Sequence, residues 1–334
     1  MLNSAKDIQV DAVVMWVDSD DPKFQEQYEE YNPQSVKNKA QGEGKGRHRS
    51  NGELKYCLRG IYKNLPWVRN IYIVTNGQRP GFIRDNAWGD KVHLVTHSEI
   101  LPEEVLPTFN SFAIESALHN IPGLSENFLR FSDDFFVISP VEKETVFGSM
   151  GYGRQYLGAY IPKCNEEGYN VLKKPYLNLL VHNREILEGK LRISCDKNYL
   201  HVPQLRAKSV CEKFCEVFSE EVDFTRRSRL RALNNVSLLF SYPHYVLDNF
   251  YRLFYKDGVF QHPDVKYKHW GECRQVLAGD KNSDWKKRFE KAFDEQVLFL
   301  NVNDNFGENP EPEDVEWLEL NMEDKMSYKA PWEA

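Results

Sequence analysis

A chain of 334 residues, of which 41% are apolar and 13% aromatic, can bury one large core or two joined ones. Its net charge of −7 and isoelectric point near 5.8 argue against a nucleic-acid binder. A mean hydropathy of −0.61, with no apolar run near the ~20 residues of a membrane span, argues against an integral membrane protein. The opening residues, MLNSAKDIQVDA, lack secretory-signal features, and the six cysteines include no C-x-x-C pair. We therefore expect a soluble, cytoplasmic protein with buried thiols.

The first predicted strand covers residues 10–17, VDAVVMWV, a nearly continuous apolar run typical of a strand covered on both faces. It runs into Asp18-Ser19-Asp20-Asp21-Pro22, where the proline ends further pairing. Acidic residues after a first strand can hold a nucleotide ribose or a metal, and they are equally common in turns. The polar residues 23–46, which end in QGEGKG, predict a flexible loop.

A basic loop, RHRSNGE at residues 47–53, leads into a predicted amphipathic helix at residues 53–65. The free N–H groups and the dipole of a helix N-terminus favour a bound phosphate. The Walker pattern is absent, so this loop is not a P-loop.

Further strands are predicted at residues 71–75, 92–96 and around 128–138, with a helix at 109–120. This alternation implies βαβ units, so the predicted fold class is α/β, with a Rossmann-like or GT-A-like, largely parallel sheet flanked by helices over residues 1–141. Residues 142–199 lack periodicity and predict an irregular or inserted region that shapes a substrate groove. Residues 200–309 predict a mostly helical portion that completes the active site, with helices near 207–218 and 285–300. The acidic, proline-containing residues 310–334 predict a surface tail.

Two adjacent carboxylates, Asp133 and Asp134, stand where one apolar run ends and another begins. Charged groups are rarely buried without a partner, so this pair predicts a cation at the carboxyl end of a central strand. The alternative is a pair of aspartates in a surface turn.

Several sequence blocks resemble the Stealth family of sugar-1-phosphate transferases of bacterial capsule and exopolysaccharide synthesis, which are related to the Golgi enzyme that makes the mannose-6-phosphate tag. Residues 47–78 and 106–136, the latter ending in NFLRFSDDFF, resemble the family's second conserved region. Shorter blocks at residues 11–22, 201–203 with Arg231 downstream, and 302–305 resemble its other regions. Two departures are Ser50, where the family often has Asp, and Ser132, where Asn is expected. We interpret both as tuning, because neither removes an ionisable group.

The resemblance implies that a glycan hydroxyl attacks the phosphorus of a UDP-sugar that carries an N-acetylhexosamine, and that UMP leaves. It implies Mg²⁺ or Mn²⁺ at the diphosphate, and an oligosaccharide or lipid-linked saccharide as acceptor, with peripheral contact at the inner membrane face. Carried over residue by residue, it implies catalytic roles for Asp134, His201 and Arg231, cation ligands at Asp134, Asn303, Asp304 and Asn305, and donor contacts at Trp16, Asp18, Arg49, Asn51, Asn76, Asn110 and Asp133.

Some alternatives stay open at this level. His201 could be a general base or a donor to the phosphate, and the arginine role could shift from Arg231 to Arg229. Without the resemblance, the triplet Asn303-Asp304-Asn305 would suggest a turn. The alternative functions are a glycosyltransferase that uses Asp18-Ser19-Asp20 and releases UDP, and a glycan-binding protein without activity.

Overall fold

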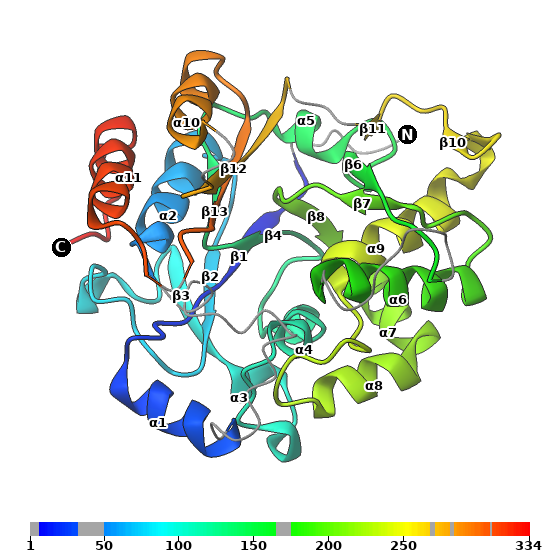
Figure 1. The fold of residues 1–334 in the computed structure, drawn as a ribbon, viewed down its shortest axis with the longest axis horizontal. Coiled ribbons are helices and arrows are strands. Elements are labelled where there is room, and N and C mark those ends of the chain that lie inside the picture. Colours follow the sequence, from blue (N-terminus) through cyan, green and yellow to red (C-terminus); the bar gives the residue numbers. More distant parts are fainter. Residues whose placement is uncertain (1–6, 33–49, 165–174, 268–270, 281–283, 308) are drawn as a thin grey trace.

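The computed structural model describes residues 7–32, 50–164, 175–267, 271–280, 284–307 and 309–334. Its centre is a five-stranded sheet with the order β3-β2-β1-β4-β8 (Figure 1). These strands are β1 (Val10–Met15), β2 (Ile71–Thr75), β3 (Val92–Thr96), β4 (Asn127–Ser132) and β8 (Gln204–Ala207). The first four pair in parallel, and β8 runs antiparallel to β4. Parallel strands in the order 3-2-1-4 are typical of Rossmann-like folds, so the predicted α/β class is confirmed.

Burial explains why β1 is the central strand. Its valines and its alanine are fully buried between the layers. Asp11 is buried as well, and its carboxylate accepts hydrogen bonds from Arg69 Nη2 at 2.6 Å, Asn70 N at 3.1 Å and Ser125 N at 2.8 Å. Because Asn70 precedes β2 and Ser125 precedes β4, this one carboxylate joins the starts of three neighbouring strands.

Smaller sheets extend the fold. One has the order β12-β13-β5, another has the order β11-β6-β7, and a hairpin joins β9 to β10. Their bounds are β5 (Phe135–Val137), β6 (Gln155–Tyr160), β7 (Lys197–Tyr199), β9 (Tyr255–Lys256), β10 (Val259–Phe260), β11 (Val265–Tyr267), β12 (Cys273–Ala278) and β13 (Phe299–Asp304). Strand β13 runs antiparallel to β5 and places Asn301 opposite Phe135, which brings the C-terminal part of the chain to the end of β4.

Helices cover the sheets on two flanks. In Figure 1, α2, α10 and α11 lie on one flank and α6, α7, α8 and α9 on the other. The helices are α1 (Pro22–Tyr31), α2 (Glu53–Asn64), α3 (His97–Ile100), α4 (Ser111–Glu115), α5 (Lys143–Phe147), α6 (Pro175–Lys190), α7 (Lys208–Val217), α8 (Ser219–Arg227), α9 (Leu238–Val246), α10 (Trp285–Asp294) and α11 (Pro312–Lys325). Shorter helical turns are η5 (Asp85–Ala87), η6 (Glu103–Val105), η7 (Leu118–Asn120), η9 (Leu247–Tyr251) and η10 (Arg252–Phe254). Among the described residues, none of the helices is long and apolar enough to cross a membrane.

Some elements differ from the sequence prediction. Part of the polar stretch 23–46 is helix α1, because the Asp21 side chain accepts hydrogen bonds from two N–H groups of its first turn and Pro22 suits the first helical position. The helix predicted at 285–300 ends at Asp294. Gln296 has a φ of 51°, which breaks the helix, and the continuous apolar run that follows forms β13.

Residues 142–199 contain regular structure rather than the irregular region expected from the sequence. They hold α5, β6 and the 16-residue helix α6. Leu180, Asn183, Arg184 and Leu187 are buried at helical spacing, but two of these four residues are polar, so apolar residues alone do not mark the buried face of α6. The one-sided spacing that identifies an amphipathic helix is therefore missing from its sequence.

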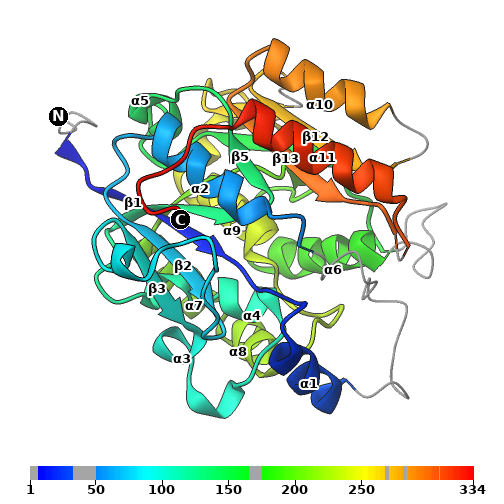
Figure 2. The same cartoon turned by 90° about the vertical axis from the view of Figure 1, so that its left-hand side faces the viewer.

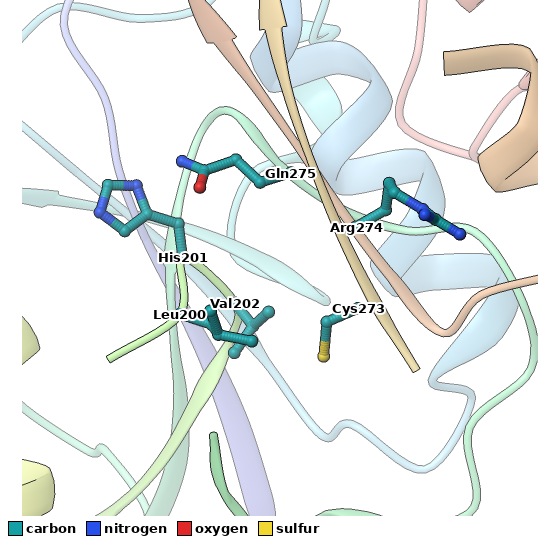
Figure 3. A pocket seen from close by; sticks show the side chains of 6 residues that line it. All are labelled: Leu200, His201, Val202, Cys273, Arg274 and Gln275. Atoms are coloured by element: carbon teal, nitrogen blue, oxygen red, sulfur yellow. The ribbon is translucent and has the colours of Figure 1, made fainter. Parts of the chain in front are cut away.

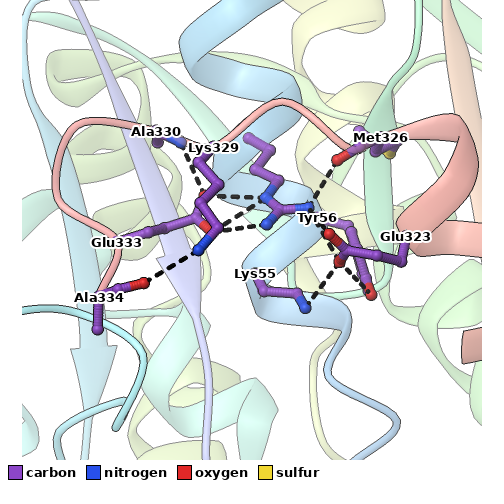
Figure 4. A network of polar contacts seen from close by, with 9 residues as sticks. Lys55, Tyr56, Glu323, Met326, Lys329, Ala330, Glu333 and Ala334 are labelled. Atoms are coloured by element: carbon purple, nitrogen blue, oxygen red, sulfur yellow. Dashed lines mark hydrogen bonds and ion pairs between the residues drawn. The ribbon is translucent and has the colours of Figure 1, made fainter.

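The prediction of an acidic surface tail at residues 310–334 is wrong. Figure 2 shows α11 lying along α2, and its residues Leu318 and Met322 are buried. Beyond the helix, Trp332 is buried too. The acidic residues have a specific use, because Glu323 and Glu333 both bind Arg59 of α2, whose side chain is 2% exposed (Figure 4). We call residues 312–334 the C-terminal clasp.

Candidate active site

Three loops that carry predicted site residues meet at one edge of the central sheet. Met15, at the end of β1, lies opposite Val74 of β2 and Ser132 of β4. Trp16, Asn76 and Asp133 follow these strands, and they therefore emerge side by side at the carboxyl ends, where α/β sheets bind ligands.

The loops after β1 and β2 are joined by Gln78, which the sequence did not single out. Its carboxamide accepts a hydrogen bond from Asp18 N at 2.9 Å and donates one to Asp18 O at 2.7 Å. The Asp18 carboxylate accepts from Asp20 N at 3.0 Å. Both predicted donor-binding loops are thus held in one arrangement.

Four carboxylates gather beyond the ends of β4 and β13, and we call Glu53, Asp133, Asp134 and Asp304 the acidic cluster. Asn51 connects two of them, because its Nδ2 lies 2.7 Å from Glu53 Oε1 and 3.5 Å from Asp304 Oδ2. On the other side, Asn301 Nδ2 donates to Asp134 Oδ2 at 2.8 Å. The cluster therefore joins the N-terminus of α2, the β4–β5 turn and strand β13.

The acidic cluster holds more negative charge than its surroundings stabilise. Burial and the charge of Glu53 together raise the pKa of Asp134 to about 6, against the lowering effect of the hydrogen bond from Asn301. Burial and the charges of Asp134 and Glu53 raise the pKa of Asp133 well above its usual range. Burial also raises the pKa of Glu53, and Asp304 adds to this. Carboxylates in this condition favour a bound cation.

Two buried amide oxygens also suit a cation. Asn51 Oδ1 and Asn301 Oδ1 have no hydrogen-bond partner among the described residues, although both side chains are at least nine-tenths buried. Hard divalent cations take carboxylate and amide oxygens together with water. Within the described part of the chain, however, no three His, Cys, Asp or Glu side chains stand close enough to hold an ion by themselves. The carboxylate oxygens of the acidic cluster therefore fit Mg²⁺ only if amide oxygens or water complete the set of ligands.

The triplet Asn303-Asp304-Asn305 does not act as one ligand group. Asp304 belongs to the acidic cluster, whereas Asn303 Oδ1 accepts a hydrogen bond from Gln275 Nε2 at 3.1 Å. Asn305 is exposed beyond the end of β13. Neighbouring side chains of a strand point to opposite faces, so consecutive residues rarely reach one ion.

His201 packs against the first residue of β5, the strand that follows the acidic pair. Its ring centroid is 6.2 Å from that of Phe135, the residue after Asp134. It lines a small hollow, partly open to solvent, with Leu200, Val202, Cys273, Arg274 and Gln275 (Figure 3). Figure 3 shows the carboxamide of Gln275 pointing toward the His201 ring. The prediction that Asp134 and His201 share one neighbourhood is consistent with this geometry.

A buried group of ionic residues lies below the acidic cluster. Arg130, in the middle of β4, has its Nε 3.0 Å from Glu115 Oε1, and Arg206 Nη2 is 2.5 Å from the same oxygen. All three side chains are at least 95% buried. Burial lowers the pKa of Arg130, and the charges of Asp134 and Asp133 oppose part of this lowering. Arg130 thus supplies positive charge directly behind the acidic pair.

Arg231 lies on the segment between α8 and α9. Its Nη2 donates to Ser111 Oγ at 2.7 Å, and its guanidinium lies 5.2 Å from the ring centre of Phe112. Its charge contributes to lowering the pKa of Glu115, the partner of Arg130. Arg229, the alternative, donates to the carbonyl oxygens of Leu106 and Pro107 and serves the backbone instead.

Asn110 and Arg49 are also predicted to contact the nucleotide-sugar donor. Asn110 is fully buried, and its amide donates to Ser228 O at 2.8 Å and Asn235 Oδ1 at 2.9 Å. Asn110 thus anchors the segment that carries Arg231, and its contact with the donor stays a prediction. Arg49 lies outside the described residues.

Sequence reasoning missed Glu53, Arg130 and Asn301. Asn301 lies two residues before Asn303, and the two-residue period of a strand could have placed both on one face. In the sequence, Glu53 marks only the start of a helix, and Arg130 is only part of a strand. No local pattern marks either residue, because their roles come from contacts made across the fold.

Two capsular polysaccharide phosphotransferases are similar to this chain over most of its length. The chain is 33% identical over 236 residues to the capsular polysaccharide phosphotransferase LcbA of Aeromonas hydrophila, an alignment that covers 70% of this chain and 64% of that protein. It is 32% identical over 240 residues to the capsular polysaccharide phosphotransferase SacB of Neisseria meningitidis serogroup A, covering 71% of this chain and 43% of that protein. The chain thus spans less than two thirds of either relative.

Among solved structures, the galactosyltransferase LgtC in complex with donor and acceptor sugar analogues aligns over 96% of both chains, with a TM-score of 0.42 and 9% identity. This likeness is too distant for any conclusion about the site. Two family models match the chain: residues 47–154 match Stealth protein conserved region 2, and residues 200–248 match Stealth protein conserved region 3. These two matched regions carry Asp133, Asp134, His201 and Arg231, and the chain belongs to the Stealth family.

Proposed function

We propose that this protein transfers a sugar 1-phosphate from a UDP-sugar to a glycan hydroxyl in capsular or exopolysaccharide synthesis, and releases UMP. The observation that carries the proposal is the acidic cluster, with its raised pKa values and unpartnered amide oxygens, beside His201. The similar proteins of Aeromonas hydrophila and Neisseria meningitidis are capsular polysaccharide phosphotransferases, which supports the same reaction class. An N-acetylhexosamine is the proposed sugar.

The proposed cation is Mg²⁺ or Mn²⁺, held by Asp134 and Asp304, with the Asn51 and Asn301 amide oxygens and water completing its ligands. When bound, it would neutralise charge on the donor diphosphate, which is the main requirement of phosphoryl transfer. Arg130 balances part of the remaining negative charge from behind, so the cluster can stay ionised once the cation is present.

The chain's own groups align the reactants. Trp16, Asp18 and Asn76, on the joined loops after β1 and β2, are proposed to hold the nucleoside and sugar. His201 is proposed to accept the proton of the acceptor hydroxyl as its oxygen attacks the phosphorus. The bond between that phosphorus and the UMP oxygen breaks, and UMP leaves as an anion. Arg231, a permanently charged planar fork, is proposed to bind phosphate oxygens.

The acceptor is proposed to be an oligosaccharide or a lipid-linked saccharide. A lipid-linked acceptor would bring the protein to the inner face of the cell membrane, and we propose a cytoplasmic location with peripheral contact there. None of the described helices could span the membrane, so such contact would be made by the surface of the fold.

Product analysis with a radiolabelled UDP-sugar and an acceptor tests the reaction. We expect UMP release and a phosphodiester signal in phosphorus NMR. Release of UDP would instead identify a glycosyltransferase, and donor binding without turnover would identify a binding protein.

Asp134→Ala, His201→Ala and Arg231→Ala should each lower the rate more than a hundredfold while circular dichroism stays unchanged, because each removes a group that acts on the diphosphate or the acceptor. Near-normal activity of Asp134→Ala would remove the cation assignment.

A further inference from the structure

The phenol of Tyr176 lies against the ring of His201. Its oxygen is 3.2 Å from His201 Nε2, and the two rings meet edge to face with centroids 6.1 Å apart. Tyr176 is the second residue of α6 and is 40% exposed, which is unusual for a large aromatic residue in contact with a site. The contact joins α6 to the segment before β8.

His201 is therefore held between two aromatic rings. Phe135, which follows the acidic pair, approaches the imidazole at a tilt of 41°, and Tyr176 meets it at 87°. Phe135 offers only a ring, whereas Tyr176 adds a hydroxyl at hydrogen-bond distance from a ring nitrogen. Of these two neighbours, Tyr176 is the one that can respond to the protonation state of the histidine.

The chemistry of a hydroxyl suits this place. A phenol is both a donor and an acceptor, and it is neutral near pH 7. At His201 it can accept the Nε2–H hydrogen of the neutral imidazole, which leaves Nδ1 bare to take the proton of the acceptor hydroxyl, and the same Nε2–H hydrogen bond persists in the protonated ring. A hydrogen bond that persists through both states fixes the orientation of the ring while the proton moves.

We propose that Tyr176 is a positioning residue for His201, which keeps the imidazole oriented toward the acceptor hydroxyl as the ring takes up that proton. This inference rests on the proposed function. Tyr176 lies between the two matched Stealth regions, residues 47–154 and 200–248, so neither family model includes it. Tyr176 itself takes no proton from the substrate in this scheme.

Tyr176→Phe tests the proposal, because it keeps the ring contact and removes only the hydroxyl. We expect kcat to fall about tenfold, the effect of losing one hydrogen bond to a working group. The KM for the UDP-sugar should stay within about twofold, since the donor-binding residues are untouched. The pH–rate profile should shift, which loss of packing alone would not cause. The matched control is Tyr62→Phe, because Tyr62 is 36% exposed and its ring packs on Trp332.

A second measurement separates this inference from the proposed function. In protein labelled with ¹⁵N-histidine, with the His201 signal assigned through His201→Gln, the Nε2 resonance should move in Tyr176→Phe and stay in place in Tyr62→Phe. An unmoved resonance overturns the proposal, as does an unchanged kcat and pH profile in an active enzyme. If the wild-type protein transfers no sugar phosphate, the proposed function fails, and the NMR result alone decides whether Tyr176 holds the histidine.

Discussion

Asp134 illustrates at the residue scale how a binding site costs stability. Its carboxylate is hydrogen-bonded to Asn301, yet burial and Glu53 raise its pKa to about 6. An acid whose pKa is higher in the folded than in the unfolded state binds protons more tightly when folded. The ionised form therefore destabilises the protein without a cation, and this cost grows as the pH rises through about 6.

The raised pKa of Asp134 predicts how the variant Asp134→Asn behaves in the presence of EDTA. The variant keeps the side-chain shape and loses the charge, so its melting temperature should exceed that of the wild type at pH 7.5. The difference should shrink as the pH falls below about 6, because Asp134 then becomes neutral in the wild type as well. Differential scanning fluorimetry across this range measures it.

Added Mg²⁺ should reverse the order at pH 7.5 by stabilising the wild type through mass action. Asp90→Asn, at an exposed position, serves as the control and should follow the wild type throughout. If Mg²⁺ raised the melting temperature of Asp134→Asn as much as that of the wild type, this would count against a cation at Asp134.

Helix α2 is the element on which the site depends. Its N-terminus carries Glu53 beside Asn51, and its middle packs tightly on β5. Gly60 makes this packing possible, since a Cβ placed there would lie 2.7 Å from Val137 O and 3.1 Å from Val137 N. Both atoms belong to a strand backbone that has little freedom to move. The close approach of α2 thus fixes where Glu53 stands relative to the β4–β5 turn.

Gly60→Ala should therefore lower the free energy of unfolding by about 1–3 kcal/mol, the usual cost of overpacking. Helix propensity alone predicts the opposite, a gain of up to ~1 kcal/mol. Gly189→Ala is the matched control, because Gly189 is in α6 and a Cβ there meets no atom within 4 Å. That substitution should give the gain. Urea denaturation distinguishes them, and a stabilised Gly60→Ala protein would contradict the packing described here.

At the scale of the whole molecule, the C-terminal clasp completes the core. Arg59 is nearly inaccessible, and its Nη2 lies 2.8 Å from Glu333 Oε2 while its Nη1 donates to Met326 O at 2.7 Å. Met326 and Trp332 bury apolar surface on the same side. The last residues of the chain thus hold the helix that carries Glu53.

Glu333→Ala should lower the free energy of unfolding by about 3 kcal/mol, because it leaves the buried charge of Arg59 without its main partner. The double variant Arg59→Met/Glu333→Leu should recover much of this loss, since it removes the charge as well. Glu216→Ala, which breaks an exposed ion pair with Lys213, should leave the urea midpoint unchanged. Equal effects of Glu333→Ala and Glu216→Ala would show that the clasp contributes little.

The sequence by itself determined the parts of this protein that depend on local patterns. Apolar runs identified β1, β2, β3 and β4, the spacing of apolar residues identified α2, and the residues after the strands identified Asp133, Asp134 and Asn76 as neighbours. The alternation of strands and helices predicted the fold class, and the family blocks added His201 and Arg231. These features are readable because strand and helix periods, and the ends of parallel strands, impose their geometry on adjacent residues.

Only the tertiary structure decided which distant residues complete the site. Asn51 reaches Asp304 across 253 positions, Asn301 reaches Asp134 across 167, and Tyr176 meets His201 from a helix with no one-sided pattern. It also turned an expected acidic tail into the clasp on Arg59, and it buried Asn110 beneath the segment of Arg231. Charge pairing, burial and close packing act through space, so a pattern read along the chain does not contain them.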